Sequence, residues 1–121
     1  MTDRMIRTMI FSSADIPESL PGLKSKEISP SFARTAEDAV TMIENRPPDV
    51  IILCLFHHSD KSFFQYLITR KNKIPVIVLT ESEKERNKAL KKGAVAAWPL
   101  SIQSTDLSVA VKALNLFKTF D

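Results

Sequence analysis

The sequence contains little glycine and little cysteine, and each scarcity excludes a class of site. Only two glycines occur in 121 residues, too few for either common glycine-rich phosphate-binding loop. A single cysteine excludes an internal disulfide and a multi-cysteine zinc site. No apolar run approaches the roughly 20 residues of a transmembrane helix, and the N-terminus lacks the apolar segment of a signal peptide. The sequence therefore predicts a cytoplasmic domain that does not contact a membrane.

The charge and composition are those of an ordinary globular domain. Charged residues make up 26% of the chain and hydrophobic residues 44%. This length suffices for one hydrophobic core but not for two, so we expect a single domain over residues 1–121. The net charge of +3 is mild, and no groove-entering motif accompanies it. We therefore expect no nucleic acid among the partners.

One apolar stretch organises the rest of the chain. It reads Pro48-Asp49-Val50-Ile51-Ile52-Leu53-Cys54-Leu55 and follows a second proline. An unbroken run of Val, Ile and Leu without polar alternation is typical of a strand that is buried on both faces of a parallel sheet. Open α/β sheets place their sites at the carboxyl ends of the strands, so we expect any chemistry near Cys54.

Strand patterns alternate with helix patterns along the chain. Strands are expected at 5–11, 27–33, 74–79 and 94–98 besides the central one, and helices at 35–46, 59–70, 82–92 and 104–117. Thr35 and Ser82 begin capping boxes, Ser59 or Asp60 and then Ser104 or Thr105 are the other candidate caps, and Gly93 is a natural helix stop. Prolines within 15–24 shorten the first helix to a stub, and Pro30 limits the second strand to an edge. This alternation predicts an α/β fold with a doubly wound, five-stranded parallel sheet.

Three segments in this order give the chain a resemblance to a known family. They are Pro48-Asp49-Val50-Ile51-Ile52-Leu53, then Ile74-Pro75-Val76-Ile77-Val78-Leu79-Thr80, and then Lys92-Gly93-Ala94 followed by Pro99-Leu100. With these segments the chain resembles the CheY-like receiver domain of two-component response regulators over nearly its whole length. The resemblance implies the strand order 2-1-3-4-5 of flavodoxin-like folds and a site at the switch point between strands 1 and 3.

The residues that carry the family's chemistry are mostly replaced here. Receivers transfer a phosphoryl group to an aspartate at the end of strand 3, with Mg²⁺ held by an acid pair after strand 1. By position, the acid pair corresponds to Ser12 and Ser13, the acceptor to Cys54, the hydroxyl of strand 4 to Thr80, and the lysine of strand 5 to Trp98. Only Thr80 matches the family pattern. Without the carboxylates and the lysine, we expect neither bound Mg²⁺ nor catalysis of phosphoryl transfer.

Trp98, the only tryptophan, carries two further expectations. We favour a core or edge aromatic beside Pro99, and the alternative is a side chain presented to a partner. Receivers commonly have a cis peptide bond before this proline, so the resemblance implies a cis bond between Trp98 and Pro99.

These substitutions predict a degenerate pseudo-receiver that is not an enzyme, needs no cofactor and acts as a protein–protein interaction module in signal transduction. Its partner would be another signalling protein or domain. The candidate partner face comprises Lys84, Lys88, Lys91, Trp98 and Lys112. For the lysines of 82–92, an ordinary solvated helix face is the alternative, because glutamates are interleaved with them. A homodimer is the alternative partner arrangement, through apolar surface left by the short first helix or through Phe117 and Phe120.

Two carboxylates keep a second function open. Asp15 and Asp60 are the acids expected nearest the site, and each also lies where a helix would want an N-cap, which we favour. In the alternative, they support a weak Mg²⁺ site in an atypical receiver with residual phosphoryl chemistry.

Cys54 keeps a third function open, that of a thiol-based redox sensor. We favour a buried apolar role, because free cysteine is commonly buried and no basic residue adjoins it in sequence. His57 and His58 could in principle join Cys54 around a metal, but surface loop histidines are the favoured reading and we expect no metal.

Overall fold

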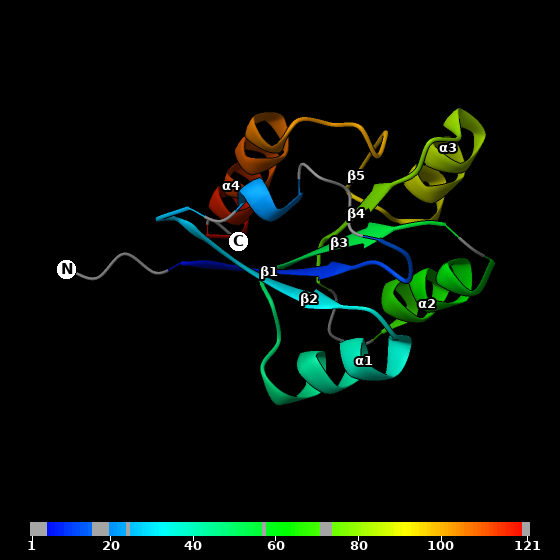
Figure 1. Cartoon of the computed structure of the whole chain (residues 1–121), viewed down its shortest axis with the longest axis horizontal. Helices are drawn as coiled ribbons and strands as arrows, with labels where there is room; N and C mark the ends of the chain where they lie inside the picture. Colours follow the sequence, from blue (N-terminus) through cyan, green and yellow to red (C-terminus); the bar gives the residue numbers. More distant parts are fainter. Residues whose placement is uncertain (1–4, 16–19, 24, 57, 71–73, 120–121) are drawn as a thin grey trace.

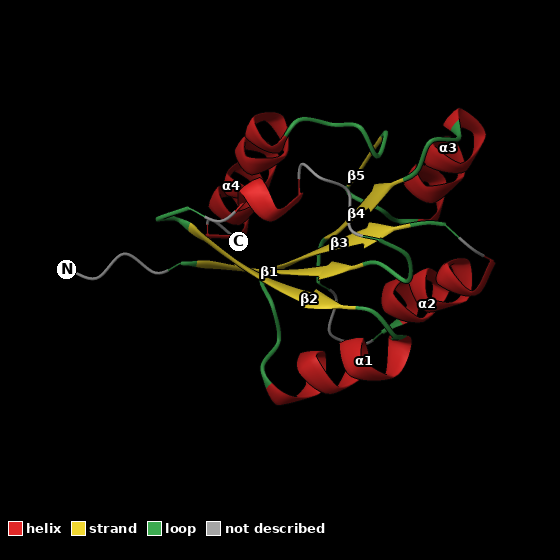
Figure 2. Ribbon diagram, viewed as in Figure 1, coloured by secondary structure: helices red, strands yellow, loops and turns green. Residues whose placement is uncertain are grey.

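Five parallel strands form one sheet with the order β2-β1-β3-β4-β5 (Figures 1 and 2). The structure is a computed structural model that describes residues 5–15, 20–23, 25–56, 58–70 and 74–119. The strands are β1 (Ile6–Phe11), β2 (Ile28–Ala33), β3 (Val50–Cys54), β4 (Val76–Leu79) and β5 (Ala96–Trp98). The predicted fold class and strand order are therefore confirmed.

Helices cover both faces of the sheet (Figure 2). They are the 3-10 helix η1 (Leu20–Leu23) and the α-helices α1 (Ala36–Asn45), α2 (His58–Thr69), α3 (Glu83–Lys92) and α4 (Ser104–Thr119). Within the ranges given above, no helix combines the length and the apolar character that a membrane crossing requires.

Strand alternation divides the buried side chains into two cores. On β3, Ile51 and Leu53 pack with apolar residues of α1, α2 and α3, whereas Ile52 and Cys54 pack on the other face with η1 and α4. All five residues of β3 are buried. This confirms the strand as one that is buried on both faces, as its unbroken apolar sequence predicted.

Two helix starts and one helix stop form as predicted. Thr35 Oγ1 accepts a hydrogen bond from the Asp38 N–H at 3.1 Å before α1, and Ser82 Oγ accepts one from the Glu85 N–H at 3.2 Å before α3. Gly93 ends α3 with φ of 129°, a conformation that side chains with a Cβ rarely adopt.

The residues predicted to cap the other two helices lie inside those helices instead. Helix α2 begins at His58, so Ser59 and Asp60 lie inside it, and helix α4 begins at Ser104 itself. The carbonyl of Gln103 accepts the hydrogen bond of the Leu107 N–H at 3.1 Å, which makes Gln103 the residue that precedes α4. The prediction relied on the capping preference of Ser and Thr side chains. The structure instead defines the start of α4 by its first backbone hydrogen bond, which is accepted by Gln103.

The peptide bond between Trp98 and Pro99 is trans, so the expected cis bond is wrong; no cis bond occurs in the ranges that the structure describes. The trans form is favoured even before proline, by about 0.5–1 kcal/mol. Resemblance to a family therefore did not predict this bond correctly.

The short first helix covers the sheet rather than leaving it open. Leu20 and Leu23 of η1 are buried against Leu107 and Val111 of α4 in the core of that face. The strand residues beneath them are also buried, with Ile10 completely inaccessible. The helix is shortened as predicted, but the expectation of an uncovered apolar surface beside it is wrong, because its two leucines fill the gap.

Candidate functional site

The carboxyl ends of the three strands β3, β4 and β5 present an apolar row to the face covered by η1 and α4. Cys54 pairs in register with Leu79, and Leu79 pairs with Trp98. Cys54 and Leu79 are fully buried, and Trp98 packs half-buried against the same core. Two of the predicted site positions are therefore apolar packing positions: Cys54 lies in the hydrophobic core, and Trp98, separated from it by β4, packs against that core.

The two serines after β1 form different hydrogen bonds. Ser12 is buried, and its hydroxyl donates to the carbonyl of Ala14 at 2.9 Å. Ser13 donates to the carboxylate of Asp60, at 2.9 Å from Oδ1 and 3.1 Å from Oδ2. Ser12 thus closes a local turn, whereas Ser13 connects the end of β1 to helix α2.

Asp60 is the polar centre of this end of the sheet. It lies in the first turn of α2, and only 1% of its surface is exposed. Besides the bond from Ser13, its Oδ2 accepts a hydrogen bond from the backbone N–H of Phe56 at 2.8 Å. A buried carboxylate requires such donors to offset the loss of hydration. Its interpretation as an N-cap is wrong, because the carboxylate reaches back to the loop before the helix and across to β1.

The thiol of Cys54 is neutral in this environment. Burial, and to a smaller extent the nearby negative charge of Asp60, together raise its pKa from 9.0 to about 12. The thiolate is the nucleophilic form of cysteine. A pKa this high leaves almost no thiolate near neutral pH, so the arrangement disfavours thiol chemistry at Cys54.

Thr80, the one position that matches the family pattern, is held through its backbone. Its N–H donates to the carbonyl of Trp98 at 3.0 Å, and its own carbonyl accepts a hydrogen bond from Arg86 Nη1 at 2.8 Å. Nearby, Lys61 pairs with Glu85 at 3.1 Å, and this hydrogen bond lowers the pKa of Glu85. Arg86 and Lys61 therefore already interact with acceptors of the chain, the carbonyl of Thr80 and the carboxylate of Glu85.

The carboxylates do not form a site that suits Mg²⁺. Asp15 points into solvent and forms a loose ion pair with Arg34 at 4.0 Å, while Asp60 is buried against Ser13. Within the described part of the chain, no group of three His, Cys, Asp or Glu residues could hold a metal ion. Mg²⁺ requires several oxygen ligands in near-octahedral geometry, which one carboxylate with two serines does not supply.

His57 and Phe120 lie outside the described residues, as do the side chains of His58 and Phe117. His58 is the first residue of α2 and not a loop residue, so the expectation of a loop histidine is wrong for this position. The expected absence of a metal at these histidines and the C-terminal dimer contact both stay predictions.

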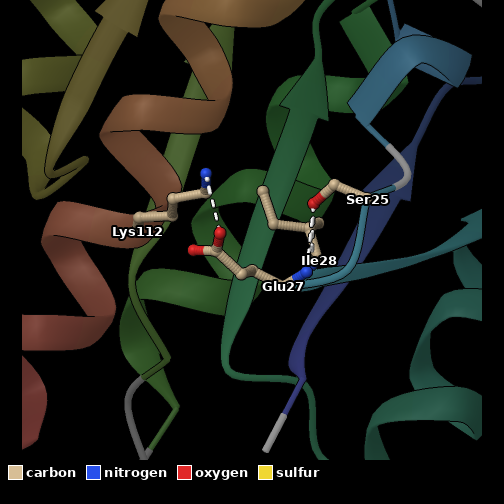
Figure 3. Close-up of polar contacts among 4 residues, drawn as sticks. All are labelled: Ser25, Glu27, Ile28 and Lys112. Carbon is tan, nitrogen blue, oxygen red and sulfur yellow. Dashed lines mark hydrogen bonds and ion pairs between the residues drawn. The ribbon is translucent and has the colours of Figure 1, made fainter. Parts of the chain in front are cut away.

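The predicted partner face divides into two locations. Lys84, Lys88 and Lys91 are exposed along α3, next to β5. Lys112 of α4 instead pairs with Glu27 at 3.4 Å, immediately before the opposite edge strand β2 (Figure 3). The turn that carries Glu27 is closed by Ser25, whose Oγ accepts hydrogen bonds from the N–H groups of Glu27 and Ile28, each at 3.2 Å. Lys112 is thus directed toward β2.

Comparison with solved structures identifies the fold. No family model and no curated protein matches the chain. The receiver domain of Francisella response regulator 1452 is 18% identical with a TM-score of 0.76, over 93% of this chain and 98% of that one. The signal receiver domain of a Vibrio parahaemolyticus protein described as a LuxO repressor is 21% identical with a TM-score of 0.75, over 98% of both chains. NtrX from Brucella abortus in complex with ATP is 14% identical with a TM-score of 0.81, over 94% of this chain and 28% of that one. The chain therefore has the fold of response regulator receiver domains.

Asp60→Asn should destabilise the protein, because the neutral amide replaces one of the two acceptor oxygens by an NH₂ group and removes the charge that strengthens the hydrogen bonds from Ser13 and Phe56. We expect the free energy of unfolding in urea to fall by about 1–3 kcal/mol. Asp15→Asn is the matched control, and it should change the same quantity by less than about 1 kcal/mol because Asp15 is exposed. Equal stabilities of the Asp60 variant and the wild type would contradict the central position given to this carboxylate.

The raised pKa of Cys54 predicts a pH dependence of stability. Above pH 9.0 the thiol ionises in the unfolded chain but stays protonated in the folded one up to about pH 12. The unfolded state is therefore favoured increasingly as pH rises through this range. The stability of the wild type should fall toward that of Cys54→Ala, measured by urea unfolding at pH 8 and at several values from pH 9 upward. A constant difference between the two proteins would show that the thiol is not desolvated.

Proposed function

We propose that the chain is a pseudo-receiver, a protein–protein interaction module of signal transduction that works without phosphorylation and catalyses no phosphoryl transfer. The observation that carries this proposal is the buried carboxylate of Asp60, bound by Ser13 and by the N–H of Phe56. This negative charge belongs to the chain itself and lies at the end of the sheet where receivers bind Mg²⁺ and phosphate.

The electrostatics of this end of the sheet argue against an incoming phosphoryl group. Phosphoryl transfer depends on cations that neutralise the charge on the transferred group. Here Asp60 contributes negative charge, Trp98 replaces the lysine, and the thiol of Cys54 has a pKa of about 12. A phosphoryl group would meet a carboxylate and a protonated thiol, and the two cations described at this edge, Lys61 and Arg86, already interact with acceptors of the chain.

Helix α3 supports the interaction role. Lys84, Lys88 and Lys91 are exposed at spacings of four and three residues, which places them along one side of the helix. Leu90 and Val95, in the helix and the turn after it, are each 46% exposed. The basic side of α3 suits a signalling partner with an acidic surface, while Leu90 and Val95 offer apolar contacts on another side of the helix and in the turn after it. A homodimer is the alternative occupant.

Titration with Mg²⁺, and then with Mg²⁺ and beryllofluoride, tests the independence from phosphorylation. Trp98 borders Thr80 and the β3–β5 row, so its fluorescence reports any ordering of this end of the sheet. We expect a flat response, and no phosphoryl adduct in the intact mass after incubation with acetyl phosphate. As a positive control, unfolding in urea should change the fluorescence of Trp98 and so show that this signal responds to its environment. A saturable quench with Mg²⁺ would overturn the proposal.

Charge reversal on α3 tests the interaction role. The triple variant Lys84→Glu, Lys88→Glu and Lys91→Glu should lose the partner in affinity capture from native extract, compared by mass spectrometry with the wild-type protein. The matched control reverses three exposed charges elsewhere, Lys26→Glu, Arg34→Glu and Arg46→Glu, and should keep the partner. Equal loss in both variants would assign the effect to net charge and contradict docking through α3.

A further inference from the structure

We propose a second site, in a cavity of about 510 Å³ at the amino ends of the strands, for a small molecule that carries one anionic group on an apolar body. Residues of β1 and β2, the last turn of α1 and the segment after it line this cavity. It is distinct from the Asp60 site, which lies at the carboxyl ends of the strands. Its volume is within the range of ordinary ligand pockets, about 300–1,000 Å³.

The apolar wall of the cavity consists mainly of methionine. Met5 lines it from the position just before β1, Met9 from the middle of β1, and Met42 from the last turn of α1. Three unbranched thioether side chains can adjust to ligands of different outline and offer polarisable contacts to flat or extended apolar groups. This wall favours a ligand with an apolar body and does not by itself specify one shape.

The charged wall consists of two arginines. Arg7 on β1 and Arg46 at the C-cap of α1 both line the cavity. Arg7 is fixed in place, because its Nη2 donates to the carbonyls of Arg46 and Pro47. No ion pair joins either guanidinium to a carboxylate of the described residues. Two guanidinium groups at one opening select an anion, since each presents several N–H donors to its oxygen atoms.

Asp49, whose carboxylate is bound to the backbone of Arg7, does not line the cavity. It is 4% exposed, and its carboxylate accepts the hydrogen bond of the Arg7 N–H at 2.9 Å. Ser29 and Ser31 add polar atoms from β2. Side chains along a strand alternate between the two faces of the sheet. Because Ile28 belongs to the core covered by η1 and α4, the hydroxyls of Ser29 and Ser31 lie on the opposite face, the one that α1 covers.

Anilinonaphthalene sulfonate, an aromatic body with one sulfonate, is the probe for the first experiment. Its fluorescence should rise on adding folded protein and saturate at one site. Arg46→Gln should weaken binding roughly tenfold, as expected for loss of one charge-assisted contact. Arg34→Gln, a matched arginine at the opposite end of β2, should bind as the wild type does. The uncharged analogue N-phenylnaphthylamine should bind at least tenfold more weakly than the sulfonate.

The substitution Ser31→Phe gives an independent test, because the larger side chain would fill the cavity. Ser31 is exposed on the edge strand β2, where an aromatic residue is compatible with β structure. It should abolish the fluorescence rise while far-ultraviolet circular dichroism stays unchanged. Equal binding by the wild type, Arg46→Gln and Ser31→Phe would overturn the proposal, as would equal affinity for the charged and uncharged probes. The outcome does not depend on docking through α3, so the two proposals fail separately.

Discussion

A single buried carboxylate organises the end of the sheet where parallel α/β folds place their sites. Asp60 draws together the loop after β1, through Ser13, and the loop after β3, through Phe56. In a loop exposed to water, each of these hydrogen bonds would contribute little to stability. At a buried position, losing one would leave an unpaired donor or a poorly solvated charge, and both are costly in the protein interior. The positions of both loops, and with them the start of α2, depend on this acid.

The fold could be predicted from the sequence because its signals are local or repeat along the chain. Unbroken Val and Ile runs marked the buried strands, and Thr35, Ser82 and Gly93 marked helix boundaries through contacts within four residues. The site could be predicted only in part. The sequence showed which residue types occupy the positions of the site, including the two serines, Cys54 and Trp98. It did not predict the hydrogen bond between Ser13 and Asp60, because these residues are 47 positions apart and no local spacing indicates such a contact.

The stub η1 shows where local reasoning fails in the other direction. The prolines within 15–24 correctly predicted a shortened helix, and a shortened helix suggested exposed apolar surface. Two leucines nevertheless close that face, since burial depends on where side chains reach and not on how many turns the helix has. Lys112 is a second example. The sequence grouped it with the lysines of α3, but its side chain forms an ion pair with Glu27 next to β2, at the other edge of the sheet.

The position of Pro30 has a consequence for assembly. Pro30 lies in the middle of β2, opposite Thr8 of β1, at one edge of the sheet. A proline lacks the N–H that an added strand would need, so a second copy cannot extend the ladder evenly along this edge. The other edge, β5, is only three residues long. Both borders of the sheet thus resist strand-to-strand aggregation, and self-association through paired strands is disfavoured relative to association through helix surfaces.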